Sequence, residues 1–381
     1  MLRLPVKDLQ KGMIVAQSIY NHHGGSYLVR GSAITPGYIR QLQKIGIPTV
    51  NVTSADPSFH LLPPDDVVQE ETRVDAIRHV FDAFQSVEHE GRLDADAMER
   101  VSDNILMDLI ARRENLVQLT DIRLHDTYTF AHSVNVAILS AMLGLHCHYT
   151  KKDLQVLTLG ALLHDLGKVD VPAEILTKNT RLTPEEFALI QQHPEDGAKH
   201  IHAMDHALPQ TSLLAAIARE HHEHIDGRGY PRGLKGDEIH RFAKIVAIAD
   251  VYDALTSERP YKRAYTPNIA YNIMRNVNVG QFDETLLDIF FNNVSIFPVG
   301  TILKTIWGYA IVKSCAFGKT ETPVIVLFAG LDGQVLPEPI TIDLTEDPRG
   351  AHAILMVIAD NELRHFIHSL SLDPSQFLRE E

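Results

Sequence analysis

One aspartate stands in the middle of an apolar helical run. Asp250 lies within KIVAIADVYDALT, where the five residues before it are Ile, Val, Ala, Ile and Ala. An ionised carboxylate is costly to bury on so apolar a helix unless a cation or several hydrogen-bond donors lie beside it. The chain must therefore fold so that such a partner reaches Asp250. A salt bridge to Lys244 or Arg263 would meet this requirement, and so would a bound metal ion.

Two adjacent histidines end a predicted helix just before a glycine-rich turn. The stretch HHEHIDGRGYPRGLKG runs from His221 to Gly236. Neighbouring side chains on a helix point about 100° apart, so such a pair does not build one apolar face. The pair suits two imidazoles around one metal or on either side of a substrate, although these residues alone are equally consistent with a structural role. The glycines allow a sharp turn and a close approach of the backbone.

Helical periodicity extends from about Val67 to about Phe291 and contains most of the residues that could carry chemistry. Histidines and aspartates at helix ends or on apolar helices form a set of seven: His132, His164, Asp165, His193, His221, His222 and Asp250. Nitrogen and oxygen ligands without thiolates suit first-row metals such as iron, manganese, cobalt or zinc. One carboxylate can bridge two ions, and two neighbouring ions form the clamp used in phosphoester hydrolysis.

The composition of the chain limits the kinds of binding partner and the cellular compartment that we expect for it. The formal net charge of −14 is unfavourable for broad contact with a nucleic-acid backbone, so we expect no DNA binding. The two cysteines, Cys147 and Cys315, are far apart and lack metal-type spacing, which fits a reducing compartment. The N-terminus lacks the apolar core of a signal peptide, and no run approaches the roughly eighteen apolar residues of a membrane span. We therefore expect a cytoplasmic protein without a membrane span.

The chain divides into regions of different pattern. Residues 1–66 show short apolar runs around one helical segment, which predicts a small α/β N-terminal accessory domain. Residues 67–119 are predicted to form a helical connector, and residues 120–293 an all-α domain. Residues 294–381 carry β-branched residues and Gly/Pro punctuation, which predicts a small β-rich C-terminal accessory domain. We expect a multidomain protein whose central all-α domain carries the chemistry.

The order of these motifs resembles the HD-GYP family, a branch of the HD-domain metal phosphohydrolases. His132 is followed by HDLGK, by His193, by the HHEHIDGRGYPRGLKG stretch through Ile239, and finally by Asp250. The match runs from about residue 120 to about residue 291, roughly half of the chain. The resemblance implies that residues 120–293 form an HD-type catalytic domain, and the flanking regions are similar to accessory segments found beside such domains.

The resemblance implies a binuclear centre of two divalent transition metal ions, most often iron or manganese. One ion would be held by His132, His164, Asp165 and Asp250. Asp165 would bridge to a second ion held by His193, His221 and His222. Some family members bind a third metal through a glutamate four residues before the first ligand histidine. Tyr128 takes that place here, so we do not expect a third ion.

The family hydrolyses cyclic di-GMP to the linear dinucleotide pGpG and sometimes on to GMP. The resemblance implies a metal-bridging hydroxide that attacks phosphorus in line with the departing 3′ oxygen. Asp165 and Lys168 would be the catalytic residues, with Lys168 stabilising charge on the phosphate oxygens. Arg259 and Lys262 would contact the phosphate backbone, and Tyr230 would pack against a guanine or orient a phosphate. The GYP turn is also a candidate face for a protein partner.

Several alternatives remain open from the residues themselves. Arg259 and Lys262 fit solvated charges after a helix, and Tyr230 fits a residue that caps the turn. Glu223 fits either a carboxylate that orients a histidine or a solvated charge at a helix end. At the level of function, the alternatives are an HD-type phosphohydrolase of another nucleotide and a non-catalytic cyclic-dinucleotide sensor or protein-interaction module.

Overall fold

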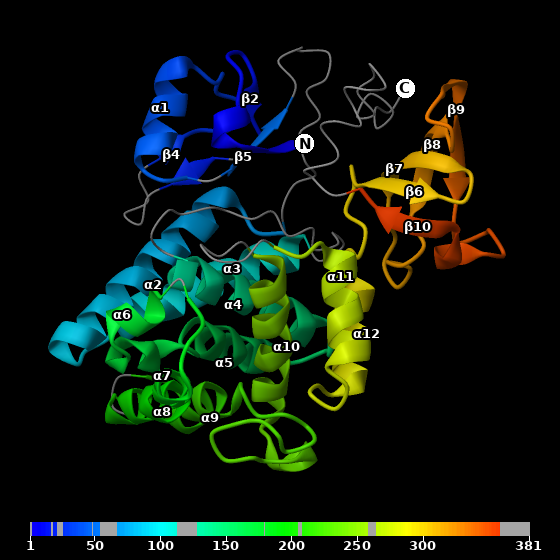
Figure 1. Cartoon of the computed structure of the whole chain (residues 1–381). Coiled ribbons are helices and arrows are strands. Elements are labelled where there is room, and N and C mark those ends of the chain that lie inside the picture. The colour runs from blue at the N-terminus through cyan, green and yellow to red at the C-terminus, as the bar shows by residue number, and fades with distance from the viewer. Residues whose placement is uncertain are drawn as a thin grey trace.

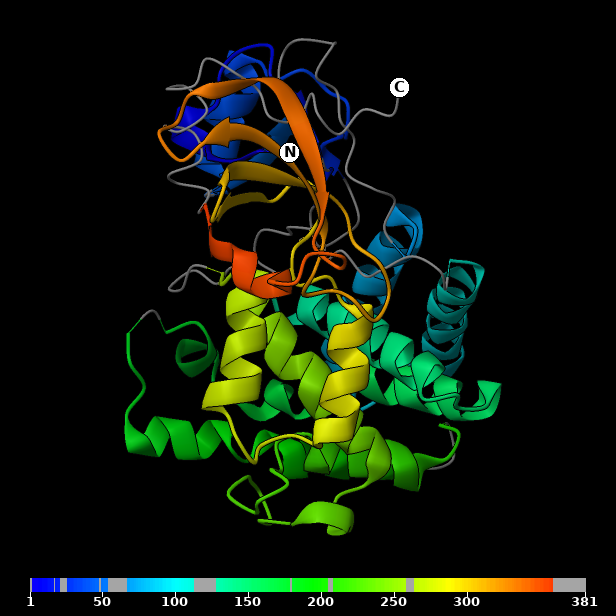
Figure 2. The same cartoon turned by 90° about the vertical axis from the view of Figure 1, so that its right-hand side faces the viewer.

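A helical body with β-sheet regions at both ends of the chain makes up the computed structural model (Figure 1). The structure describes residues 2–16, 18–20, 26–47, 49–53, 67–112, 128–178, 180–204, 208–257 and 264–358. The two β regions lie at one end of the helical body, and α8, α9 and the loop that follows α9 lie at the other (Figures 1 and 2). The predicted division into a helical centre and flanking β-containing regions is confirmed at this level.

The N-terminal region builds a small sheet and one helix around its own core. Its elements are β1 (Leu2–Pro5), η1 (Val6–Asp8), β2 (Ile14–Val15), β3 (Ile19–Tyr20), β4 (Ser26–Leu28), α1 (Pro36–Lys44) and β5 (Thr49–Thr53). The sheet has the antiparallel order β1-β5-β2, and β3 pairs separately with β4. Thr35 caps α1 through the Tyr38 backbone N–H, and Pro36 takes the first helical position. Buried side chains between Leu4 and Val52 form a core separate from that of the helical body.

The helical body follows the N-terminal region along the chain. Its elements are α2 (Glu70–Glu90), α3 (Ala95–Ala111), α4 (Tyr128–His146), α5 (Lys151–Leu162), η3 (Leu166–Asp170), α6 (Ala173–Leu176), α7 (Pro184–Ile190), α8 (His193–Ala203), α9 (Thr211–Glu220), η4 (Gly236–Glu238), α10 (Arg241–Thr256), α11 (Pro267–Asn272), η5 (Ile273–Val277) and α12 (Glu284–Asn293). Side-chain caps begin several of these helices, among them Asp94 for α3 and Thr150 for α5.

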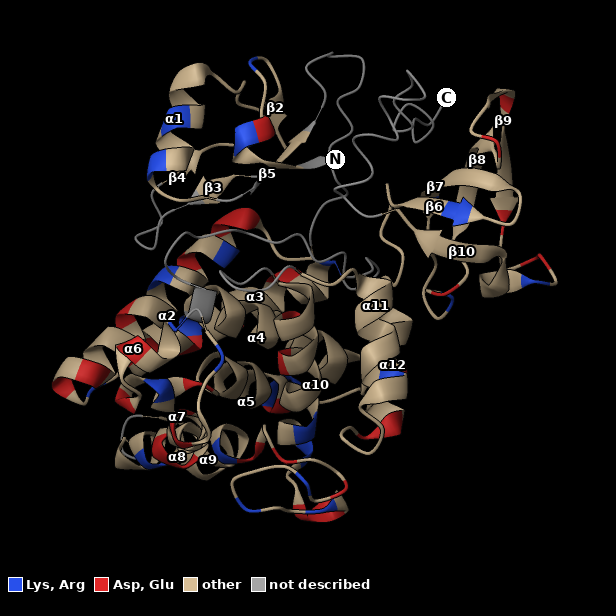
Figure 3. Ribbon diagram, in the orientation of Figure 1, with Lys and Arg blue, Asp and Glu red and all other residues tan. Residues whose placement is uncertain are grey.

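Two helices, α4 and α10, form the middle of this body. Residues 132–144 of α4 are all buried, as expected of a helix that is apolar on every face. In α10, residues 245–250 are buried as well, so Asp250 is drawn into the interior with its apolar neighbours. Helix α4 packs against α2, α5 and α10, and α2 also packs against η3. Lys and Arg are interspersed with Asp and Glu along the surrounding helices (Figure 3).

The C-terminal region is a five-stranded antiparallel sheet of order β10-β6-β7-β8-β9. Its elements are β6 (Ile302–Thr305), β7 (Gly308–Ser314), β8 (Val324–Gly330), β9 (Val335–Asp343), η6 (Gly350–Ala353) and β10 (Ile354–Val357). One buried cluster runs from Val67 through the helices to Ala353, so the sheet shares the core of the helical body. The predicted boundary between residues 293 and 294 lies at the end of α12, and the buried core continues across it.

None of the described helices combines the length and apolar character needed to cross a bilayer.

Candidate metal centre

The seven histidines and aspartates singled out in the sequence meet inside the helical body. They come from α4, the turn after α5, the start of α8, the turn after α9, and α10. Their ligand atoms form two groups, and within each group these atoms lie within 4.8 Å of one another. We call the first the α10 group, comprising His132, His164 and Asp250, and the second the α8–α9 group, comprising Asp165, His193, His221 and His222. All of them are buried except His222, which is partly exposed.

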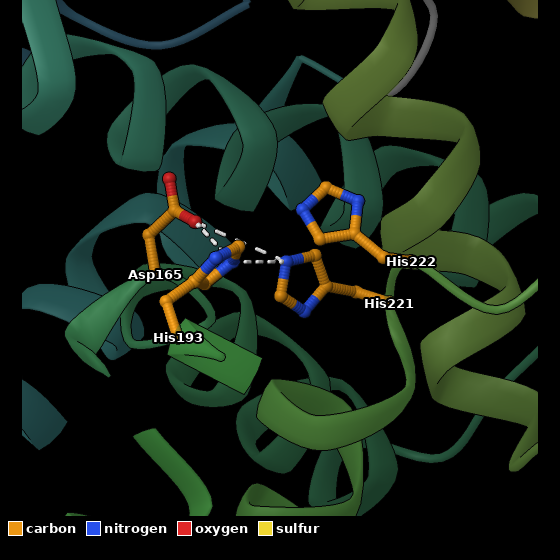
Figure 4. A group of neighbouring side chains, drawn as sticks. All are labelled: Asp165, His193, His221 and His222. Atoms are coloured by element: carbon orange, nitrogen blue, oxygen red, sulfur yellow. Dashed lines mark hydrogen bonds and ion pairs between the residues drawn. The ribbon is translucent and has the colours of Figure 1, made fainter. Parts of the chain in front are cut away.

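Asp165, a member of the α8–α9 group, presents its second carboxylate oxygen to the histidines of the α10 group. Its Oδ1 is 3.3 Å from His193 Nε2 and 3.9 Å from His221 Nε2 (Figure 4). Its Oδ2 is 3.4 Å from His164 Nε2 and 3.9 Å from His132 Nε2. A carboxylate in this position can serve ions on both of its sides, which is the arrangement that a two-metal site needs.

Three of the histidines are oriented by the backbone immediately before them. In each, Nδ1 lies within hydrogen-bond distance of the carbonyl oxygen three residues earlier, and Nε2 faces the cluster. The pairs are His164 with Ala161 at 2.7 Å, His193 with Ile190 at 2.7 Å, and His221 with Ala218 at 2.8 Å. Because a carbonyl oxygen can only accept, Nδ1 carries the proton and Nε2 offers its lone pair to the centre.

His132 is oriented differently, by a carboxylate distant in the sequence. Its Nδ1 lies 2.7 Å from Asp253 Oδ2. Asp253 Oδ1 accepts from Asn135 Nδ2 at 2.8 Å and from Ser257 Oγ at 3.0 Å. Asp253 is not among the residues predicted from the sequence. Its signal was a second carboxylate in the same apolar helix, one turn beyond Asp250 and therefore on the same side.

Both carboxylates of the cluster are held in the ionised form. Burial by itself would raise the pKa of Asp165, but the charges of Lys168 and His164 bring it well below its usual value. Burial likewise opposes ionisation of Asp250, yet the hydrogen bond and charge of His132 hold the pKa of that carboxyl below its usual range. The centre therefore contains two ionised carboxylates, each beside a nitrogen partner, that can act as oxygen ligands.

Burial and neighbouring charges move the pKa values of three of the imidazoles in different directions. Burial would lower the pKa of His132, but hydrogen bonds and charge from Asp250 and Asp253 outweigh it and raise the pKa to about 9. Burial lowers the pKa of His222 to about 3, and burial together with neighbouring imidazoles lowers the pKa of His221 well below its usual value. Neutral imidazole is the form that coordinates a metal ion, so His132 would release its proton on binding one.

Two buried atoms at the centre make no hydrogen bond to any of the described residues, namely His164 Nε2 and Asp165 Oδ1. Leaving a buried polar atom unsatisfied typically costs about 1–3 kcal/mol, so native structures seldom do so without a reason. A divalent cation bound by nitrogen and oxygen ligands would satisfy both atoms. The donor set present therefore fits a bound divalent metal.

Lys168 reaches this cluster from η3. Its Nζ donates to Asp165 Oδ2 at 2.5 Å, while a quarter of its side chain remains exposed. Gly167, one residue earlier, packs against the start of α8, where a β-carbon would lie 2.0 Å from the His193 carbonyl oxygen. The glycine in HDLGK thus allows η3 and α8 to come together with Asp165 and His193 side by side.

The turn after His222 folds back over that residue. A β-carbon at Gly229 would lie 2.3 Å from the His224 backbone nitrogen, so only glycine fits there. The Tyr230 N–H donates to the His222 carbonyl at 3.1 Å, and the Tyr230 ring stacks on the His222 ring with centroids 4.7 Å apart. Burial raises the pKa of the Tyr230 phenol, which therefore stays neutral. Tyr230 is thus placed at the edge of the cluster.

Both expectations for Glu223 are wrong. Its side chain is buried, so it is not a solvated charge. Its two oxygens accept from the backbone N–H groups of Arg232, at 2.7 Å, and Leu234, at 2.9 Å, so it does not orient a histidine. The carboxylate instead binds the later part of the turn, because the chain folds back and brings the N–H groups of Arg232 and Leu234 to the end of α9.

The ion pair suggested between Asp250 and Lys244 is also wrong. Lys244 Nζ pairs with Asp237 at 3.2 Å, at the outer end of α10. Asp250 instead lies 3.0 Å from His132 Nε2 and 3.7 Å from His222 Nδ1. A helix turns about 100° per residue, so Lys244 and Asp250, six residues apart, point in different directions.

Some of the predicted residues fall outside the part of the chain that the structure describes. Arg259, Lys262 and Arg263 belong to residues 258–263, between the end of α10 and residue 264. Tyr128 is the first residue of α4, one helical turn before His132, and its side chain is not described.

Comparison with known proteins gives matches over this region and beyond it. A family model described as HD domain matches residues 104–286. A cyclic di-GMP phosphodiesterase of Pseudomonas aeruginosa is 30% identical over 329 residues, which cover 79% of this chain and 78% of that protein. The 3′3′-cGAMP-specific phosphodiesterase 1 of Vibrio cholerae is 38% identical over 167 residues, which cover 44% of this chain and 38% of that protein.

A solved structure also resembles the fold. It is described as an HDG"Y"P protein from Bdellovibrio bacteriovorus, with a TM-score of 0.50 and 20% sequence identity. The alignment covers 76% of this chain and 97% of that chain, so the likeness extends past the helical body.

Proposed function

The chain belongs to the HD-GYP family, and from this membership we propose that it is a metal-dependent phosphodiesterase that hydrolyses cyclic di-GMP. A relative of which the chain covers 78% is named a cyclic di-GMP phosphodiesterase. The observation that carries the proposal is the position of Asp165, whose two oxygens face different groups of histidines. A buried carboxylate with this double contact suits a pair of cations, and a pair of cations suits a phosphodiester.

We propose further that two ions bind. The α10 group together with Asp165 would hold one, and the α8–α9 group would hold the other. Bound there, iron or manganese ions would supply Lewis acidity and lower the pKa of water. A third ion is not part of this proposal, because Tyr128 offers a neutral phenol where a carboxylate would be needed.

The chain's own groups would bind and orient the substrate. Lys168 is close enough to Asp165 to place positive charge at the centre, and its exposed part can donate to a phosphate oxygen. Tyr230 offers a ring face and a neutral hydroxyl beside His222. Arg259 and Lys262, in the segment after α10, would contact the remaining phosphate. The product would be the linear dinucleotide pGpG.

A panel of cyclic dinucleotides, assayed with the full chain loaded with Mn²⁺ or Fe²⁺, tests this proposal. We expect cyclic di-GMP to be converted to pGpG, with no conversion by an Asp165→Ala variant. Binding of cyclic di-GMP without any hydrolysis would instead indicate a sensor, the non-catalytic alternative.

The same panel decides a second candidate substrate, 3′3′-cGAMP. The match to a 3′3′-cGAMP-specific phosphodiesterase, at 38% identity over 167 residues, favours including it. A kcat/KM for 3′3′-cGAMP well above that for cyclic di-GMP would replace the proposed substrate and leave the proposed chemistry unchanged.

A further inference from the structure

Helix α2 places a charged side chain deep inside the helical body. Arg73 is only 1% exposed, although a guanidinium stays protonated at any working pH. Its Nη1 donates to Asn135 Oδ1 at 2.7 Å, a contact between residues 62 positions apart. Burying a charge is costly unless it is paired or hydrogen-bonded, so the bond to Asn135 is among the contacts that offset the burial of Arg73.

Asn135 links Arg73 to the candidate metal centre through hydrogen bonds to Arg73 and Asp253. Its Nδ2 donates to Asp253 Oδ1 at 2.8 Å, and Asp253 Oδ2 lies 2.7 Å from His132 Nδ1. An amide has one accepting and one donating end, so the bond from Arg73 fixes which end faces Asp253. With Asp253 so held, the His132 ring presents Nε2 to Asp250 at 3.0 Å.

This support reaches His132, whereas three other histidines of the centre are held locally. His164, His193 and His221 each use a carbonyl oxygen of their own preceding turn. Their orientation therefore depends on local backbone, whereas that of His132 depends on side chains from α2, α4 and α10. Arg73 also lies outside residues 104–286, the part of the chain that the HD-domain model matches.

We propose that Arg73 is a positioning residue for the metal centre, which acts through Asn135 and Asp253 on the ring of His132. Helix α2 then sets the affinity of the metal site in the α10 group and leaves the site in the α8–α9 group unchanged. The inference rests on the proposed function only in that the two groups bind metal ions.

The test is a calorimetric titration of the metal-free full chain with Mn²⁺, compared between wild type and Arg73→Met. We expect two binding events in the wild type and a loss of about 10–100-fold in the affinity of one of them in the variant, the range typical for groups that orient metal ligands. Arg78→Met is the matched control, because Arg78 lies on the same helix, is exposed and pairs with Asp75. It should leave both affinities unchanged.

Two further backgrounds identify which site is weakened. In Asp250→Ala, which removes a ligand of the α10 group, adding Arg73→Met should leave the remaining affinity as it was. In His193→Ala, which removes a ligand of the α8–α9 group, adding Arg73→Met should weaken the remaining site. Equal weakening of both sites by Arg73→Met, or no weakening of either, would overturn the proposal.

Circular dichroism melts show whether each variant folds. If Arg73→Met does not fold, Asn135→Asp tests the same link, because it keeps the side-chain shape and gives Arg73 a carboxylate while removing the donor to Asp253. The same selective weakening is expected, and unchanged affinities would contradict the proposal. A wild-type chain that binds no Mn²⁺ would overturn the metal centre as well, whereas absence of hydrolysis alone would overturn only the proposed activity.

Discussion

The two groups of the candidate metal centre use similar side chains, but His132 of the α10 group is supported differently from His164, His193 and His221. In the α8–α9 group, His193 and His221 are each held by a carbonyl oxygen three residues earlier. In the α10 group, His132 is held by Asp253, which lies 121 residues away in the sequence. The first kind of support exists wherever the local turn forms. The second exists only when α2, α4 and α10 are packed together, so the α10 group should be the more sensitive to changes elsewhere in the chain.

The largest effect should come from the residue that belongs to both halves of this comparison. Asp165→Ala should abolish hydrolysis and lower the metal content towards one ion or none, since its two oxygens face different groups. Elemental analysis and a cyclic di-GMP assay measure these outcomes. Asp170→Ala is the control, because this nearby carboxylate pairs with His200 on the surface. Two tightly bound ions in Asp165→Ala would show that Asp165 does not link the groups.

A smaller effect is expected when charge is removed beside the centre and the ligands are kept. Lys168→Ala should slow turnover by about a hundredfold or more, as for other donors to developing charge. Both ions should remain bound, because Lys168 belongs to neither group. Steady-state kinetics and elemental analysis are the measurements. Lys178→Ala, which removes a lysine paired with Glu186, provides the control. A normal rate in Lys168→Ala would make this residue irrelevant to catalysis.

Weakening the distant support should separate the two groups. Asp253→Asn should lower the Mn²⁺ affinity of the α10 group by about 10–100-fold, because one amide oxygen cannot accept from His132, Asn135 and Ser257 as a carboxylate does. The affinity of the α8–α9 group should not change. Calorimetric titration resolves the two sites, and Asp237→Asn serves as a control at an exposed carboxylate. If both sites weakened together, the different hydrogen-bond support of the two groups would have no effect on their metal affinities.

The smallest effect concerns the number of ions. Tyr128→Phe should retain both, because a neutral phenol contributes little to metal binding at working pH. Elemental analysis of the purified variant and of the wild type is the measurement. A third ion in the wild type that is absent from Tyr128→Phe would show that the phenol is a ligand and that the centre extends beyond the two groups.

The difference between the two groups also explains what could be predicted from the sequence. The motifs HDLGK and HHEHIDGRGYPRGLKG are contiguous, and the glycines within them report close packing that the structure contains at Gly167 and Gly229. The helical body and flanking β regions followed from periodicity for the same reason, since periodicity is local. Contacts between residues that are far apart in the sequence leave no such local pattern.

Glu223 and Arg73 illustrate that limit. Glu223 reads as a helix-end charge until the following turn folds back and brings the amides of Arg232 and Leu234 to it. Arg73 reads as one of many charged positions on an amphipathic helix, and only the packing of α2 against α4 gives it a buried partner. The partners of both depend on tertiary structure, which the pattern of a single segment does not encode.

The shared core of the helical body and the C-terminal sheet has a consequence for how the molecule unfolds. Residues from Val67 to Ala353 bury one continuous apolar cluster, and Thr320 donates a hydrogen bond to the carbonyl of Phe291 in α12. These parts should therefore melt as one cooperative unit, whereas residues 4–52, with a separate core, can open on their own. A chain shortened after Asn293 would accordingly lose stability throughout the helices that hold the metal centre.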